Sequence, residues 1–176
     1  MTRTFALVVV FTAFALLTFA TSPASAQDKF AQAPSPATTA SRPPGLPTDL
    51  ELPAYTLVPL AEEIKLPKGI IGVHVGKLND VLNVALIVEE VTSPTMFRGR
   101  YVWGVAPEWK VDAPGSNTIF GEIQKGKLVF SRRAGLEKHE YKIGRDGQLV
   151  VEINVFLPDG SRRGGSSAKL QRIVTP

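Results

Sequence analysis

Two histidines, His74 and His139, are the first candidates for chemistry, because imidazole can carry a proton near neutral pH and can bind a metal. A structural zinc site needs about four ligands held together, and this chain has no cysteine to supply the others. Glu140 follows His139, but the second histidine of an HExxH motif is missing. We therefore expect no metal site and no cofactor, and interpret both histidines as strand residues.

A glycine- and serine-rich stretch at 164–167 could in principle hold a nucleophile or a phosphate group. It lacks the Gly-x-Ser-x-Gly elbow that presents a catalytic serine. It also lacks the Lys-Ser/Thr ending and the following helix of a phosphate loop. We interpret it as a flexible turn or bulge beside Arg162 and Arg163.

Glu89 and Glu90 form a carboxylate pair, the type of group with which glycosidases act. Adjacent residues of a β-strand point to opposite faces. We therefore expect that these two side chains cannot flank one glycosidic bond, and that they form the polar end of a buried strand. With no other catalytic set in the chain, we predict that the protein is not an enzyme.

Aromatic side chains are the best candidates for a binding site. Tyr101 and Trp103 share one face of an alternating stretch, and Trp109 follows in a proline-rich loop. If they project into the mouth of a barrel, they can stack on a sugar or an apolar ligand. Aromatic residues also fill small cores, so each of them could be core instead. The three are the predicted ligand-binding residues, and both interpretations stay open.

The segments that would position these residues alternate as antiparallel strands do. Turn residues separate them, and Asp146-Gly147 is the clearest hairpin signal, because this pair accepts the positive φ of tight turns. We predict an all-β fold, an antiparallel up-and-down meander of about eight strands that forms a small closed or partly open barrel. A two-sheet sandwich is the alternative. The expected strands are 70–75, 81–91, 97–105, 118–124, 127–132, 138–143, 149–157 and 167–173.

The amino terminus, residues 1–26, has the three parts of a cleavable signal peptide. Arg3 supplies the positive charge, 5–20 is an uncharged apolar run, and small residues at 24–26 precede the expected cleavage site before Gln27. The apolar run is shorter than the roughly 20 residues of a membrane-spanning helix. We therefore predict an exported, periplasmic or secreted protein with no transmembrane anchor after cleavage.

Composition divides the rest of the chain into a tether and a folded part. Residues 27–54 are rich in Pro, Ala, Ser and Thr and predict a disordered linker. Residues 55–67 are transitional, and 68–174 are expected to form the β-domain. The formal charge of +4 falls to +3 when Arg3 is removed, and the basic residues are spread along strands and turns. A nucleic-acid partner is therefore not expected.

Several short motifs follow one another in a familiar order: residues 85–91, then Tyr-x-Trp-Gly at 101–104, Trp109, and Gly-Lys-Leu at 126–128. This order resembles a group of uncharacterised bacterial exported proteins with a small lipocalin-like β-barrel domain, which also occurs appended to secreted hydrolases. The likeness covers about residues 70–173. It implies the barrel and an exported location and assigns no activity. Where that group has Trp-x-Gly in its first strand, this chain has His74-Val75-Gly76.

Three functional hypotheses follow from these features. We favour a non-catalytic exported binding module for a small ligand, a glycan or a protein partner. The first alternative is an envelope-associated structural protein that engages anionic cell-wall or lipid components. The second is a cryptic hydrolase or an accessory domain of a hydrolase.

Overall fold

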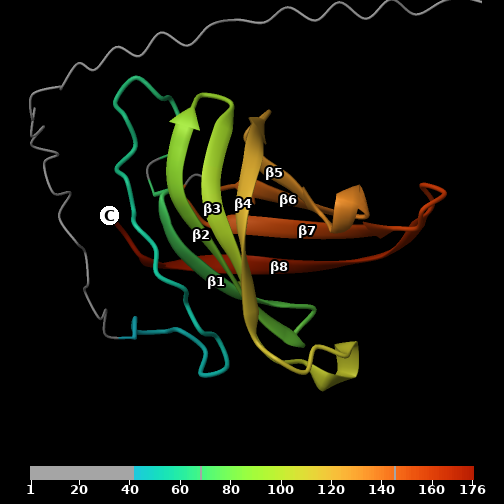
Figure 1. Ribbon diagram of the computed structural model, residues 1–176. Helices are drawn as coiled ribbons and strands as arrows, with labels where there is room; N and C mark the ends of the chain where they lie inside the picture. The colour runs from blue at the N-terminus through green and yellow to red at the C-terminus, as the bar shows by residue number, and fades with distance from the viewer. Residues whose placement is uncertain (1–41, 68, 145) are drawn as a thin grey trace, which may run out of the picture. The chain divides into compact units, whose positions relative to one another are not determined.

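The computed structural model describes residues 42–67, 69–144 and 146–176, and the strands between Gly72 and Val174 form a closed β-barrel (Figure 1). Each strand pairs antiparallel with the next in the chain, and β8 returns to β1. The predicted fold is confirmed, and the sandwich alternative is wrong. The strands are β1 (Gly72–Leu78), β2 (Leu82–Ser93), β3 (Met96–Trp103), β4 (Gly115–Gln124), β5 (Lys127–Arg132), β6 (Glu137–Ile143), β7 (Leu149–Phe156) and β8 (Arg162–Val174).

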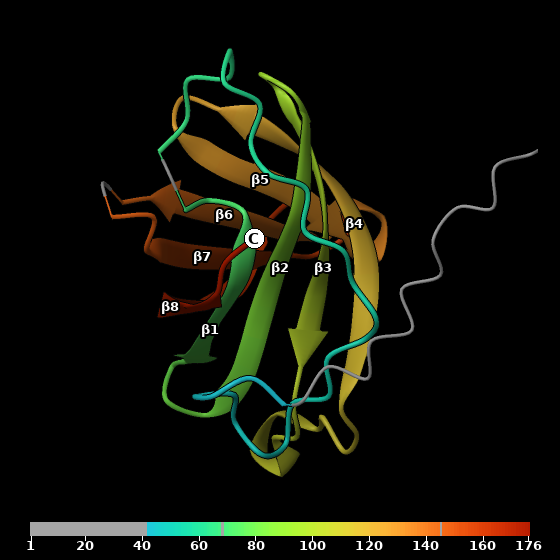
Figure 2. The ribbon, with the colours of Figure 1, turned by 90° about the vertical axis from the view of Figure 1, so that its left-hand side faces the viewer.

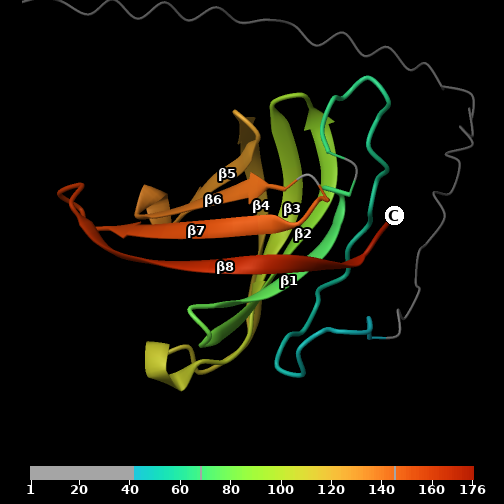
Figure 3. The same ribbon diagram turned by 180° about the vertical axis from the view of Figure 1, so that it is seen from behind.

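Two short 3-10 helices, η1 (Pro107–Trp109) and η2 (Arg133–Gly135), interrupt the loops of the barrel. Strand β8 crosses the whole back of the barrel (Figure 3) and begins at Arg162, earlier than predicted. The stretch 164–167 therefore lies within a strand that pairs with β7, and our interpretation of it as a turn was wrong. The register with β7 does shift directly before Gly164, so the alternative of a bulge beside Arg162 and Arg163 agrees with the structure. The predicted signal peptide and residues 27–41 of the linker lie outside the described residues. No helix in the described part of the chain is long and apolar enough to cross a membrane.

The barrel interior is a packed apolar core. Val84, Leu86 and Val88 alternate along β2, face inward and are almost completely buried. Their partners on the other strands include Leu128, Tyr141, Leu149 and Leu170, all without exposed surface. This alternation of apolar residues is what closes the sheet, because each strand must turn the same face to the common core.

The outer face of β1–β3 is covered by residues 42–67, here called the N-terminal strap (Figure 2). Leu50 has no exposed surface and packs among side chains that point out of the barrel, such as Val73 and Ile87. Leu46 and Leu52 lie partly buried beside it. The prediction of a disordered linker is therefore wrong for residues 42–54: the apolar residues there are few, but they are placed to dock.

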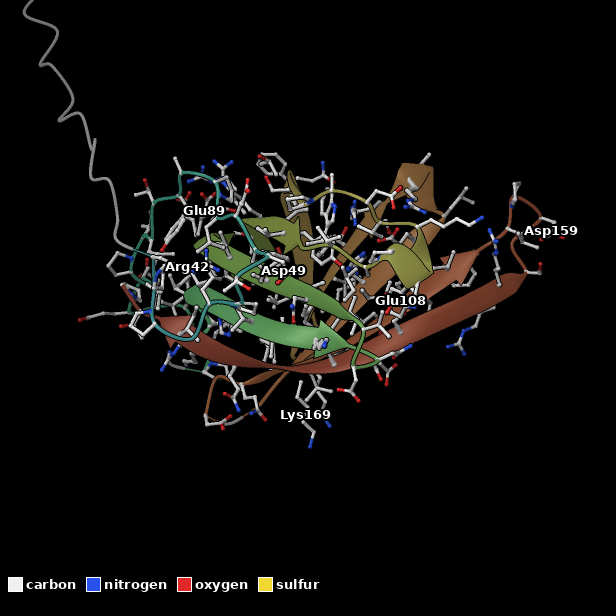
Figure 4. The ribbon with its side chains drawn as sticks, turned by 90° about the horizontal axis from the view of Figure 1, so that it is seen from below. Arg42, Asp49, Glu89, Glu108, Asp159 and Lys169 are labelled. Carbon is white, nitrogen blue, oxygen red and sulfur yellow. The ribbon has the colours of Figure 1, made fainter. Side chains whose placement is uncertain are left out.

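A carboxylate fixes the strap at the lower edge of the sheet. Asn83 donates a hydrogen bond to Asp49 Oδ1 (2.8 Å), and the backbone N–H of Val105 donates to Oδ2 (3.2 Å). Asp49, itself a residue of the strap, is labelled in Figure 4. A Cβ at Gly104 would overlap this carboxylate, so the close approach requires glycine there. The strap is thus held by both apolar burial and a specific polar contact.

A β-bulge in β2 places Glu89 and Glu90 around one guanidinium. The register with β3 shifts between Val88 and Glu90. Arg98 contacts Glu90 (3.2 Å) and Glu89 (3.6 Å), and Arg100 donates to Glu89 (3.0 Å). Our expectation that the two carboxylates point to opposite faces was therefore wrong, because a bulge breaks strict alternation. The pair still cannot flank a substrate bond, since Arg98 lies between them and Glu89 is buried.

Docking of the strap can be tested with Leu50→Ala. We expect the free energy of unfolding to fall by about 2–5 kcal/mol, because the substitution leaves a cavity in a fully buried site. Chemical denaturation of the chain measures this change. Leu157→Ala removes the same atoms from a side chain that is 39% exposed, and should cost less than about 0.5 kcal/mol. Equal small losses in both variants would show that the strap does not dock.

His74 lies inside the barrel on β1 with no exposed surface. Its Nε2 lies 3.0 Å from the carbonyl oxygen of Ile70 and donates a hydrogen bond to it. The pKa of His74 is lowered from its ordinary 6.5 to about 4, chiefly by burial; the hydrogen bond to the Ile70 carbonyl acts against this, and the nearby charge of Arg172 adds to the lowering. The imidazole is therefore neutral in the folded protein at pH 7.

This neutral histidine predicts that stability falls on acidification. Between pH 6.5 and 4 the unfolded chain protonates His74 and the folded chain does not, so each proton taken up favours unfolding. From pH 7 to pH 5 this one group should remove about 2 kcal/mol from the free energy of unfolding. The loss should shrink by that amount in His74→Gln, measured by denaturation at the two pH values. An unchanged pH dependence in the variant would contradict the assignment.

Candidate functional site

A pocket of about 470 Å³ opens at one end of the barrel. Residues of the β1–β2 turn, the η1 loop, the η2 turn and the inner face of β7 and β8 line it. We call it the mouth pocket. Its volume falls in the range of small-molecule sites. Its lining comprises Leu78, Leu82, Tyr101, Trp103, Trp109, Lys110, Val111, Asp112, Ala113, Arg132, Arg133, Glu137, Ile153, Val155 and Ser166.

The structure brings all three predicted aromatic residues to this pocket. Tyr101 forms part of its floor and is only 3% exposed, and the ring of Trp103 lies 5.9 Å from it, centroid to centroid. A Cβ at Gly115 would overlap the Trp103 indole, so glycine is what lets this ring approach the backbone of β4 closely. Trp109 enters from the η1 loop. Tyr101 therefore belongs to the core and to the pocket at once, and ligand binding by the three residues stays a prediction.

Arg132 is the central polar residue of the mouth pocket. Its guanidinium lies 4.7 Å from the centroid of the Tyr101 ring and 4.9 Å from that of Trp103. It donates hydrogen bonds to Glu137 (3.0 Å) and to Asn117 on β4 (2.9 Å). Cation–π contacts and two hydrogen bonds hold this planar group in one orientation before any ligand arrives.

Glu137 is the anion that holds this arrangement together. Its carboxylate contacts Arg132 (3.0 Å), Arg133 (3.3 Å) and Nε2 of His139 (2.6 Å). Burial alone would raise the pKa of Glu137, but the hydrogen bond from His139 and the charges of the two arginines outweigh it and leave the pKa below its ordinary value. Glu137 is therefore ionised at neutral pH.

His139 forms the layer below the pocket and has no exposed surface. Burial lowers the pKa of His139, although Glu137 acts against this, so the ring is neutral at pH 7. An ionised carboxylate accepts only, so Nε2 carries the proton and Nδ1 accepts from the Tyr141 hydroxyl at 3.4 Å. The ring stacks on Phe130 at 4.4 Å and meets the edge of Tyr101 at 4.8 Å. These side chains fill the barrel below the mouth pocket, which is therefore shallow.

The wall of the barrel is incomplete beside Arg132. Strands β4 and β5 pair only through the residues nearest their turn, from Glu122–Val129 to Gln124–Lys127. Beyond that point the hydrogen bond from Arg132 to Asn117 bridges the strands. A second hollow of about 400 Å³, the side hollow, lies on this opening, with Phe120 70% exposed at its rim. Arg132 and Arg133 line both hollows.

The sequence pattern did not point to Arg132 or Glu137 as site residues. Their pairing across η2 depends on the register of β5 and β6, in which Arg132 lies opposite Glu137. The alternation of the strands could have revealed them. Arg132 and Glu137 each lie two positions from an inward-facing residue, Phe130 and His139, and so face the barrel interior as well. Within the described residues there is no group of three or more His, Asp or Glu side chains that could hold a metal ion.

Neither the protein-family models nor the curated proteins gave a match to this chain. The barrel is of a kind compatible with a lipocalin-like protein. What the chain does must therefore be inferred from the mouth pocket itself.

Pairing of Glu137 can be tested by Glu137→Gln. We expect a loss of roughly 2–3 kcal/mol in the free energy of unfolding, because Arg132, only 18% exposed in its side chain, loses its anionic partner. Glu140→Gln is a matched control. Glu140 also contacts two cations, Lys127 and Lys138, but on the outer face where both lysines are more than 40% exposed. Water screens that cluster, so its loss should stay below about 1 kcal/mol. A control variant as unstable as Glu137→Gln would contradict this prediction.

Proposed function

We propose that this chain is a non-catalytic exported binding module that holds a small ligand or a glycan in the mouth pocket. The observation that carries the proposal is the combination of three aromatic side chains with one oriented guanidinium around a single open pocket. Such a pocket offers a ligand both apolar contact and a fixed polar anchor. Because Arg132 is held before binding, a ligand that uses it loses little free energy in ordering the site.

The titratable groups at the pocket support binding more than catalysis. Glu137 has three partners and a lowered pKa, so it is a poor proton donor at neutral pH. His139 is a possible base by type, but it lies below the floor with no exposed surface and cannot touch a ligand. A general acid or base must reach the proton that it transfers.

Tryptophan fluorescence gives a direct test, because both tryptophans of the chain line the mouth pocket. We expect saturable changes in emission on titration with at least one member of a panel of neutral mono- and disaccharides and small organic acids. Trp109→Ala should abolish saturation while Trp103 still reports. Phe120→Ala, which removes an aromatic ring outside this pocket, should leave the response intact. The absence of any saturable response across the panel would refute the proposal.

Export belongs to the proposal and depends on residues 1–26, which predict a signal peptide with release before Gln27. The exported group that the motifs resemble supports the same location. A protein partner at the mouth pocket, association with the anionic envelope, and a hydrolase role all remain predictions from sequence.

A further inference from the structure

The wall of the mouth pocket carries an excess of positive charge. Arg132 and Arg133 share one carboxylate, that of Glu137. His139, the third partner of this carboxylate, is buried and adds no charge at pH 7. At the rim, Lys110 and Asp112 offset one another. The pocket as a whole therefore has one cation more than it has anions.

The guanidinium of Arg132 also has donors left for a ligand. Of its five N–H groups, one donates to Glu137 and one to Asn117. The rings of Tyr101 and Trp103 lie against the face of the guanidinium. Its remaining N–H groups point outward in the plane of the guanidinium, where the rings do not cover them. Because Arg132 lines both the mouth pocket and the side hollow, a ligand can reach that edge. Carboxylate and sulfonate oxygens match such a donor edge.

Apart from Ser166, the rest of the lining is apolar and suits a flat or branched hydrocarbon body. Aliphatic side chains from four parts of the barrel surround the space below Trp109. The filled layer at His139 and Phe130 prevents a long chain from entering the barrel. A compact molecule fits the volume of about 470 Å³ better than a lipid tail. The aliphatic residues are Leu78, Leu82, Val111, Ile153 and Val155.

We infer that the ligand class of the mouth pocket is a small organic anion: a carboxylate or sulfonate on a compact, largely apolar or aromatic body. The anionic group binds Arg132, supported by the charge of Arg133, and the body lies against Trp109 and the aliphatic wall. This inference rests on the proposed function. A neutral glycan is the competing ligand, and the test below separates the two.

Two probes that differ mainly in charge test the ligand class. Anilinonaphthalene sulfonate is an aromatic anion, and phenylnaphthylamine has the same ring system without the sulfonate. We expect the anion to bind the native, full chain roughly tenfold or more tightly than the neutral probe, a ratio typical of one charge-assisted contact. Fluorescence titration at low ionic strength, checked by calorimetry, measures both affinities.

Matched variants test whether the arginines cause this difference. Arg133→Gln should weaken binding of the anionic probe about three- to tenfold and leave the neutral probe unchanged, since it removes one charge close to the site. Arg133 is 72% exposed in its side chain, so the variant should fold. Arg163→Gln makes the same charge change on β8, at an exposed residue that lines neither hollow, and should alter neither affinity.

Further variants locate the bound anion. Trp109→Ala should abolish binding and Phe120→Ala should not; the reverse would place the anion in the side hollow and overturn the inference. Thermal unfolding of each variant separates loss of the site from loss of the fold. Equal affinity for the two probes overturns the inference but leaves the proposed function standing. Binding of a neutral sugar, with no binding of any anion, has the same two consequences. If no compound in either experiment binds, both fail.

Discussion

The mouth of this barrel depends on one buried carboxylate. Glu137 is 10% exposed in its side chain, and an anion so far from water must be paired. Its three partners are Arg132 at the end of β5, Arg133 in η2, and His139 below the pocket. Through Arg132 the constraint reaches further: the guanidinium lies against Tyr101 and Trp103 and connects β5 to β4 at Asn117. The aromatic site and the bridged opening therefore share a single electrostatic origin.

The two ends of the barrel are built on different principles. Away from the mouth, interior side chains such as Leu128 and Leu170 are apolar and have no exposed surface. On the outer face of β1–β3, the strap adds a second apolar layer through Leu50. Such packing stabilises the fold with little demand for specific geometry. At the mouth, the interior positions carry ions and hydrogen-bonding groups, which contribute less net stability but fix orientation. This division lets the barrel keep a polar pocket without losing its core.

Sequence patterns predicted the parts of the molecule that follow strict alternation. The strand at 149–157 and the shared face of Tyr101 and Trp103 were predictable because each side chain shares a face with the residue two positions away. The exceptions each have a local cause. A bulge turns the side chains of Glu89 and Glu90 to the same face of the sheet. The polar average composition of the linker gave no sign that Leu50 is buried. The pairing of Arg132 with Glu137 depends on cross-strand register, which no single segment encodes.

The same distinction separates what the barrel tolerates from what its mouth requires. Inward positions of the strands accept any apolar side chain of suitable volume, so a barrel can be kept while few residues stay identical. The mouth is less permissive: a carboxylate opposite Arg132 and a small residue under Trp103 are both required for its geometry. The combination of Arg132, Glu137 and Gly115 with the aromatic residues is therefore a more specific signature of this site than the strand pattern.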